Sequence, residues 1–133
     1  MSNFTDEELD KIWLKGFEVE GLDPEVYRTD AADGLMKRNL YGNEGNLGWE
    51  VDHIYPKEKL KERGVPENRW DVMINLRPMN AKNNVAKGED YPKYSVAVQY
   101  DVKSKTNKEV KGVVRRVERG LQAKIVSAYA EWL

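Results

Sequence analysis

The chain's only histidine, His53, directly follows Asp52. An imidazole has a near-neutral reference pKa that suits a general base, and a carboxylate is a hard oxygen ligand for Mg²⁺ or Mn²⁺. A lone histidine is, by itself, more often structural than catalytic. Neighbouring side chains on a regular strand point to opposite faces, so both residues serve one site only if the chain turns there. Pro56, three residues on, favours such a turn.

Four asparagines follow within ten residues of each other. Asn80 and Asn84 are one helical turn apart and share a face, and Lys87 follows three residues later. An aspartate carboxylate and an asparagine carbonyl together form an all-oxygen site of the kind that holds Mg²⁺ or Mn²⁺. With one histidine and no cysteine, the chain lacks the ligands of a structural zinc site. The asparagines are Asn75, Asn80, Asn83 and Asn84.

Three predicted elements would position these side chains. Residues 49–54 form a strand candidate that ends at Pro56, and residues 72–78 form a second one after a charged connection over 57–70. Residues 80–87 form a short helix that Gly88 ends. The predicted order is therefore strand, strand, helix.

Helices are expected on both flanks. Thr5 and Glu8 form a capping box before a short amphipathic helix, and Asp23 with Pro24 begins a second one. A partial alternation over 96–102 is a weak strand signal. Apolar residues recur at helical spacing over 110–132, which predicts an amphipathic helix with a basic face that includes Arg115. The apolar face of the first helix comprises Leu9, Ile12, Trp13 and Phe17.

The composition fits one soluble domain over residues 1–133. Hydrophobic residues make up 40% and charged residues 34%, and no apolar run reaches the roughly 20 residues that span a bilayer. The absence of cysteine and of a secretion signal favours the cytoplasm. Although the net charge is −1, it is uneven: residues 1–34 have three basic and ten acidic side chains, and residues 101–133 have eight and four. A polyanion could dock on the later part.

The motifs resemble those of small, stand-alone HNH endonucleases of bacteria and phages. The resemblance rests on Gly-Trp-Glu-Val-Asp-His-Ile-Tyr-Pro over 48–56, Ile-Asn-Leu-Arg-Pro-Met over 74–79 and Lys-Asn-Asn-Val-Ala-Lys-Gly-Glu-Asp over 82–90. It covers roughly residues 12–95. The resemblance implies an α+β fold with a ββα-metal core over 41–95, a helical lead-in over 1–40 and a C-terminal extension over 96–133 with a basic amphipathic helix.

The resemblance also implies roles for individual residues. Asp52 and Asn84 match the metal ligands, His53 matches the general base, and Asn75 matches the asparagine that braces the loop bearing the base. The positions of Asn80 and Asn83 hold zinc-binding cysteines in some relatives, so packing alone is expected to hold this core together. The expected nucleic-acid contacts are Lys87, Arg77, Lys82, Arg115 and Arg119.

The reaction implied is metal-dependent hydrolysis of phosphodiester bonds in DNA, with His53 activating water and Mg²⁺ or Mn²⁺ stabilising the leaving group. Two alternatives remain open at the level of sequence: an RNase toxin of the same fold, and an HNH-like module that binds nucleic acid or protein without cutting. The apolar stripe of the C-terminal helix could also form a homodimer, which a single sequence does not decide.

Overall fold

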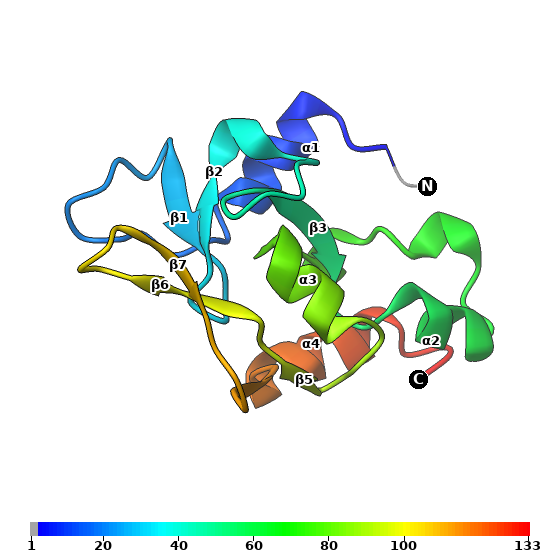
Figure 1. Ribbon diagram of the computed structural model, residues 1–133. Coiled ribbons are helices and arrows are strands. Elements are labelled where there is room, and N and C mark those ends of the chain that lie inside the picture. Colours follow the sequence, from blue (N-terminus) through cyan, green and yellow to red (C-terminus); the bar gives the residue numbers. More distant parts are fainter. Residues whose placement is uncertain (1–2) are drawn as a thin grey trace.

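The computed structural model describes residues 3–133, and within that range the chain forms four α-helices and eight short strands (Figure 1). The strands form four antiparallel pairs, β1–β2, β3–β4, β5–β8 and β6–β7, so the protein is mixed α and β, consistent with the predicted class. No helix in this range is long and apolar enough to cross a membrane. The helices are α1 (Asp6–Trp13), α2 (Lys57–Glu62), α3 (Ala81–Lys87) and α4 (Arg119–Ala128). The strands are β1 (Tyr27–Thr29), β2 (Leu35–Lys37), β3 (Trp49–His53), β4 (Leu76–Asn80), β5 (Lys93–Ser95), β6 (Val98–Asp101), β7 (Thr106–Glu109) and β8 (Val114–Arg116).

The predicted strand–strand–helix order is present at the centre of the molecule. Strand β3 pairs with β4 in a register that places Asp52 opposite Arg77, and α3 begins immediately after β4 and contacts β3. The side-chain oxygen of Asn80 accepts from the first main-chain N–H groups of α3 and caps the helix. Gly88 ends it with a φ of 51°, in the region that favours glycine. The charged connection between the strands contains α2.

A buried hydrogen-bond network joins this unit to the rest of the chain. Oδ2 of Asp30 accepts from the main chain of Asn80 and from Nδ2 of Asn83. Oδ1 of Asn83 accepts from the main-chain N–H groups of Ala97 and Val98 at the start of β6. Asn80 and Asn83 are both fully buried. Packing alone therefore does not hold the core together, contrary to expectation: these asparagines cross-link it through hydrogen bonds.

The observed elements of the N-terminal segment match the predicted ones only in part. The capping box of Thr5 and Glu8 is confirmed, but α1 ends at Trp13. The second helix predicted at Asp23 is wrong: Oδ1 of Asp23 accepts from the main chain of Glu25, and its carbonyl oxygen closes a turn that leads into β1. The lead-in is thus one helix followed by the β1–β2 hairpin, because the residues after the turn pair as strands.

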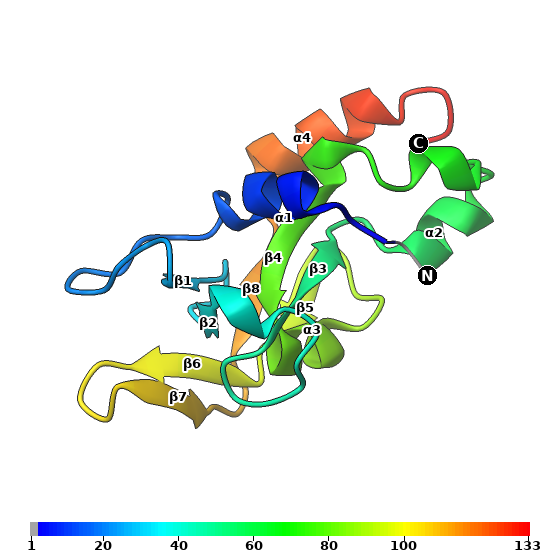
Figure 2. The ribbon, with the colours of Figure 1, turned by 90° about the horizontal axis from the view of Figure 1, so that it is seen from above.

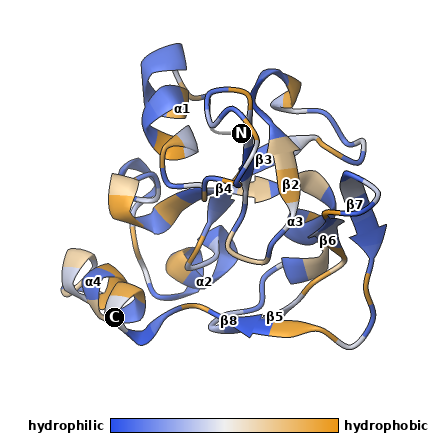
Figure 3. Cartoon of the chain, turned by 90° about the vertical axis from the view of Figure 1, so that its left-hand side faces the viewer, coloured by the Kyte–Doolittle hydropathy of each residue, from blue (hydrophilic) through white to orange (hydrophobic). Residues whose placement is uncertain are grey.

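The long helix predicted over 110–132 is also wrong in its first half. Gly112 has a φ of 71°, which a right-handed helix does not contain, and β8 then pairs with β5. The valines at helical spacing instead join strand pairing, as the hydrogen bond from Val96 N–H to the carbonyl of Val113 shows. Only α4 is helical, and hydrophobic and hydrophilic stretches alternate along it (Figure 3). The weak strand signal over 96–102 corresponds to β6.

Two apolar clusters form the core. Helix α1 packs Trp13 against Trp49 of β3, with ring centroids 5.3 Å apart, and Leu76 of β4 belongs to the same cluster. The second cluster joins Ile54, just after β3, to Ile125 and Tyr129 at the C-terminal end. The segment around residues 49–54 therefore has core on both sides, which fixes the position of Asp52 and His53.

Candidate functional site

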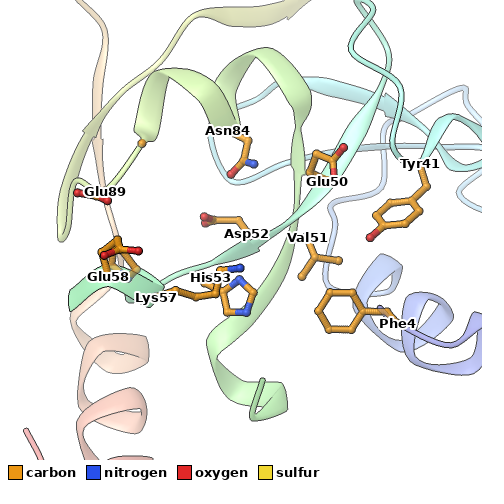
Figure 4. Close-up of a pocket in the computed structure, with 12 residues that line it drawn as sticks. Phe4, Tyr41, Glu50, Val51, Asp52, His53, Lys57, Glu58, Asn84 and Glu89 are labelled. Carbon is orange, nitrogen blue, oxygen red and sulfur yellow. The ribbon is translucent and has the colours of Figure 1, made fainter. Parts of the chain in front are cut away.

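A pocket of about 350 Å³ borders β3, and the predicted base and the two predicted metal ligands line it. Its walls include Asp52 and His53 of β3, Asn84 of α3 and Glu89 just after that helix (Figure 4). Asp52 points towards Asn84, whereas His53 lies on the opposite side of the strand (Figure 4). Both residues reach one pocket because it borders the edge of β3 that does not pair with β4: no residue of β4 is among its walls. The strand edge, rather than a turn between the two residues, brings them together.

Both oxygens of the buried Asp52 carboxylate are held by cations. Oδ2 accepts from Nε of Arg77 at 2.9 Å, and Nζ of Lys87 lies 3.2 Å from Oδ1. The side chains of Arg77 and Lys87 are only 9% and 0% exposed. Burial lowers the pKa of Lys87, against the opposing charge of Asp52. Burial acts in the same direction on Arg77, but Asp52 raises the pKa of Arg77 above its ordinary value overall.

Arg77 and Lys87, two of the expected nucleic-acid contacts, are buried beside Asp52 and do not line the pocket, and their contact with nucleic acid stays a prediction. Lys82 is exposed on α3. Arg115 belongs to β8 and pairs with an aspartate of the β1–β2 loop, and Arg119 is the exposed first residue of α4. None of these three lines the pocket.

The His53 ring is held by an aspartate that no sequence motif singles out. Nε2 of His53 lies 2.6 Å from Oδ1 of Asp71, which precedes β4 in the long connection. Burial lowers the pKa of His53, while the hydrogen bond to Asp71 and its charge oppose the shift. His53 is therefore mainly neutral at pH 7. When neutral His53 donates Nε2–H to Asp71, its lone pair is on Nδ1.

Asn75 fixes the main chain that follows His53. Its Oδ1 accepts from the N–H of Tyr55 at 2.7 Å, and its Nδ2 donates to the carbonyl of Tyr55 at 3.0 Å. The main-chain carbonyl of Asn75 also accepts from Ile54 at 2.9 Å. Asn75 itself is fully buried, so its own atoms in these three bonds are shielded from water. Asn75 thus braces the segment next to the histidine.

The oxygen donors expected for a metal ion are both at the pocket. Among residues 3–133, no group of three or more histidine, cysteine, aspartate or glutamate side chains is arranged to hold a metal. Asp52 and Asn84 nevertheless supply a carboxylate and an amide oxygen, and Mg²⁺ commonly takes only one or two protein carboxylates, with water and phosphate completing its shell. An ionised carboxylate has about four acceptor sites, so its two contacts with Arg77 and Lys87 leave Asp52 able to accept further contacts. The donor types fit Mg²⁺ or Mn²⁺.

The surroundings of these donors are acidic. Glu50, Glu58 and Glu89 border the same pocket, and Lys57 is the basic residue among its other walls. Burial, with a contribution from Glu44, raises the pKa of Glu50, as expected for a carboxylate in a negative environment. The pocket therefore attracts a cation more readily than a free anion.

Known families, curated proteins and solved structures were compared with this chain. No family model matches it, and neither a curated protein nor a solved structure matches it. The function is therefore inferred from the pocket and from the residues that surround it.

Proposed function

We propose that the protein is a divalent-metal-dependent nuclease of the HNH type that hydrolyses phosphodiester bonds in DNA. One observation carries the proposal: a neutral, oriented histidine and two oxygen donors border a single pocket on a strand–strand–helix unit. The residues are His53, Asp52 and Asn84. A water molecule in this pocket would have a base on one side and a metal-bound phosphate on the other, which phosphodiester hydrolysis requires.

His53 is the general base in this proposal. Its neutral ring accepts a proton from water at Nδ1, because Nε2 is occupied by Asp71. Asp71 then stabilises the imidazolium that forms, and Asn75 keeps the main chain beside the ring in place. Asp71 and Asn75 are positioning residues, since neither lines the pocket.

Asp52 and Asn84 would hold Mg²⁺ or Mn²⁺. When bound, such an ion acts as a Lewis acid that stabilises negative charge on the leaving oxygen. Arg77 and Lys87 fix the orientation of the Asp52 carboxylate from behind. They also neutralise it, so the nearby glutamates and the substrate phosphate must supply part of the negative charge that retains the ion.

Nucleic acid would contact the protein outside the acidic pocket. Lys82 is exposed on α3, the helix that also provides Asn84, and Arg119 is exposed at the start of α4. Contacts of this kind neutralise backbone phosphates and make binding weaken as the salt concentration rises.

A cleavage assay tests the proposal. Purified protein is incubated with plasmid DNA, single-stranded DNA and RNA in Mg²⁺, Mn²⁺ or EDTA. We expect metal-dependent cleavage of DNA that His53→Ala abolishes and Glu18→Ala, a change of an exposed residue, leaves intact. Cleavage of RNA alone would favour the RNase alternative. Binding of nucleic acid without cleavage, or cleavage that persists in a folded His53→Ala variant, would refute the proposed enzyme.

A further inference from the structure

A second cavity, of about 390 Å³, has no wall residue in common with the pocket of the proposed active site. It is bounded by the segment after α1, by β4, by β8 and by the beginning of α4. Helix α1 contacts β4, and α4 contacts the turn just before β4. Figure 2 shows this arrangement, with the beginning of β4 close to both helices. The cavity is as large as sites that bind small organic molecules.

The walls of this cavity are largely apolar. Leu76 and Pro78 of β4, Val117 after β8 and Leu121 of α4 contribute to them. Phe17 borders the cavity as well and is 56% exposed, so part of its apolar surface is in contact with water. A hydrated inorganic ion would gain nothing from these walls, whereas an apolar molecular surface would be removed from water.

The charged groups in the walls favour an anion. Four cationic side chains line the cavity, but only two carboxylates, those of Asp30 and Glu118, do so. The Asp30 carboxylate already accepts four N–H groups of the surrounding chain, so it has little capacity for a ligand. Lys15 already donates to two main-chain carbonyls, and Arg115 is paired with Asp33. Arg116 and Nη2 of Arg77 are therefore the cationic groups left for a ligand, against the one carboxylate of Glu118. The cations are Lys15, Arg77, Arg115 and Arg116.

Arg77 gives an independent indication of a missing acceptor. Its Nη2 is shielded from solvent and has no hydrogen-bond partner within residues 3–133, although its Nε is bonded to Asp52. A buried donor without an acceptor costs about 1–3 kcal/mol, and more when it carries charge. The guanidinium also lies over the ring of Tyr94, 5.2 Å from its centroid, which offsets part of this cost. Arg77 borders the cavity, so a small shift of its side chain would bring Nη2 to an acceptor oxygen placed there.

We propose that this cavity binds a small organic anion, in which an apolar body fills the walls and a carboxylate or phosphate monoester interacts with Arg77 and Arg116. Such a ligand satisfies both features of the cavity at once: apolar surface is buried, and the excess of cationic donors receives an acceptor. The site does not depend on the proposed nuclease activity, because the cavity shares no wall with Asp52, His53 or Asn84.

The test uses three probes of nearly equal apolar surface: 1-naphthoate, 1-naphthyl phosphate and the neutral 1-naphthalenemethanol. Binding to the full chain is measured by calorimetry and by NMR in EDTA, so that no metal at Asp52 can hold the phosphate. We expect 1:1 saturable binding of at least one anion, a shift of the Arg77 Nε–Hε signal, and binding of the alcohol at least 10-fold weaker. The two anions distinguish a carboxylate ligand from a phosphate ligand.

Three variants locate the site. Arg116→Ala removes one cation, and Leu121→Trp fills the cavity from the half-exposed face of α4. Each should weaken binding of the anion at least 10-fold, whereas Lys124→Ala, an exposed cation of the same helix outside the cavity, should not. The proposal is overturned if neither anion saturates, if the alcohol binds equally well, or if a folded Leu121→Trp protein binds like the wild type. Native NMR spectra establish folding for each variant.

Discussion

Replacement of Asp52 by alanine distinguishes a carboxylate that only binds metal from one that also holds the fold. A carboxylate whose only role is to bind a metal does not stabilise the metal-free fold, so replacing it leaves the free energy of unfolding in EDTA unchanged or raises it. Asp52 instead lies between two buried cations, Arg77 and Lys87. We therefore expect Asp52→Ala to destabilise the protein in EDTA.

The magnitude follows from the burial of the partners. Removing one member of a buried ion pair costs about 3–5 kcal/mol, because the remaining charge is left without compensation. Here the single change leaves both Arg77 and Lys87 uncompensated and mutually repulsive, so the loss should reach at least this range. A domain of this size has about 5–15 kcal/mol of stability in total, and the variant should be only marginally folded. Asp52→Asn, which keeps one acceptor oxygen, should lose less.

Urea denaturation in EDTA, followed by the fluorescence of the four tryptophans, measures the change. Glu50→Gln is the matched control, since Glu50 borders the same pocket and its pKa is raised by burial and by Glu44. A carboxylate with a raised pKa is unfavourable when ionised in the folded state, so this control should be neutral or stabilising at pH 7. In the double variant Asp52→Ala/Lys87→Met, part of the loss should be recovered.

Two results would refute this reasoning. One is an Asp52→Ala protein as stable as the wild type in EDTA, which would show that the two cations are not held by Asp52 in solution. The other is a loss of similar size in Glu50→Gln, which would attribute the effect to the pocket as a whole rather than to the ion pairs.

Three further predictions concern the histidine and its supports. Because the folded-state pKa of His53 is lowered, the unfolded chain takes up the proton first as the pH falls. The free energy of unfolding should therefore decrease as the pH falls from 7 through about 6.5. Urea titrations at each pH should show a smaller decrease for His53→Gln than for the wild type. Asp71→Asn should lower kcat of DNA cleavage by about 10- to 100-fold with little change in KM, and Asp71→Glu should recover part of it; an unchanged kcat would argue against a positioning role. Asn75→Ala leaves the N–H and carbonyl of Tyr55 without partners and should cost about 2–4 kcal/mol in urea unfolding.

The ends of two helices could be predicted from the sequence, because each depends on residues that are close together in the chain. The capping box at Thr5 and the glycine that ends α3 are each decided within a few positions of the chain. The resemblance predicts that Asn75 braces the loop bearing the base, and the structure shows its side-chain amide bonded to the N–H and the carbonyl of Tyr55.

The errors lie where pairing between distant segments decides the outcome. The valines around residue 113 fit a helical pattern, but a strand at residues 93–95 offers hydrogen-bond partners that their β-branched side chains favour. Burial also depends on segments that are distant in the chain. The spacing of Lys87 from Asn84 places both residues on α3, but it does not indicate that Lys87 is buried against Asp52 of β3. Asp71 could not be found at all, since it follows His53 by 18 positions, with α2 between them, and no local pattern links the two residues.

The charge balance around Asp52 links metal binding to substrate binding in the proposed enzyme. One carboxylate faces two buried cations, so this group has a positive charge in excess before any metal arrives. A divalent ion beside it raises the local charge further, and the glutamates at the pocket are too solvated to offset this completely. A phosphodiester would bring the negative charge that is lacking, and its oxygens would be further ligands for an ion held by Asp52 and Asn84. Metal and nucleic acid should therefore each bind more tightly when the other is present, a coupling that arises from Arg77 and Lys87.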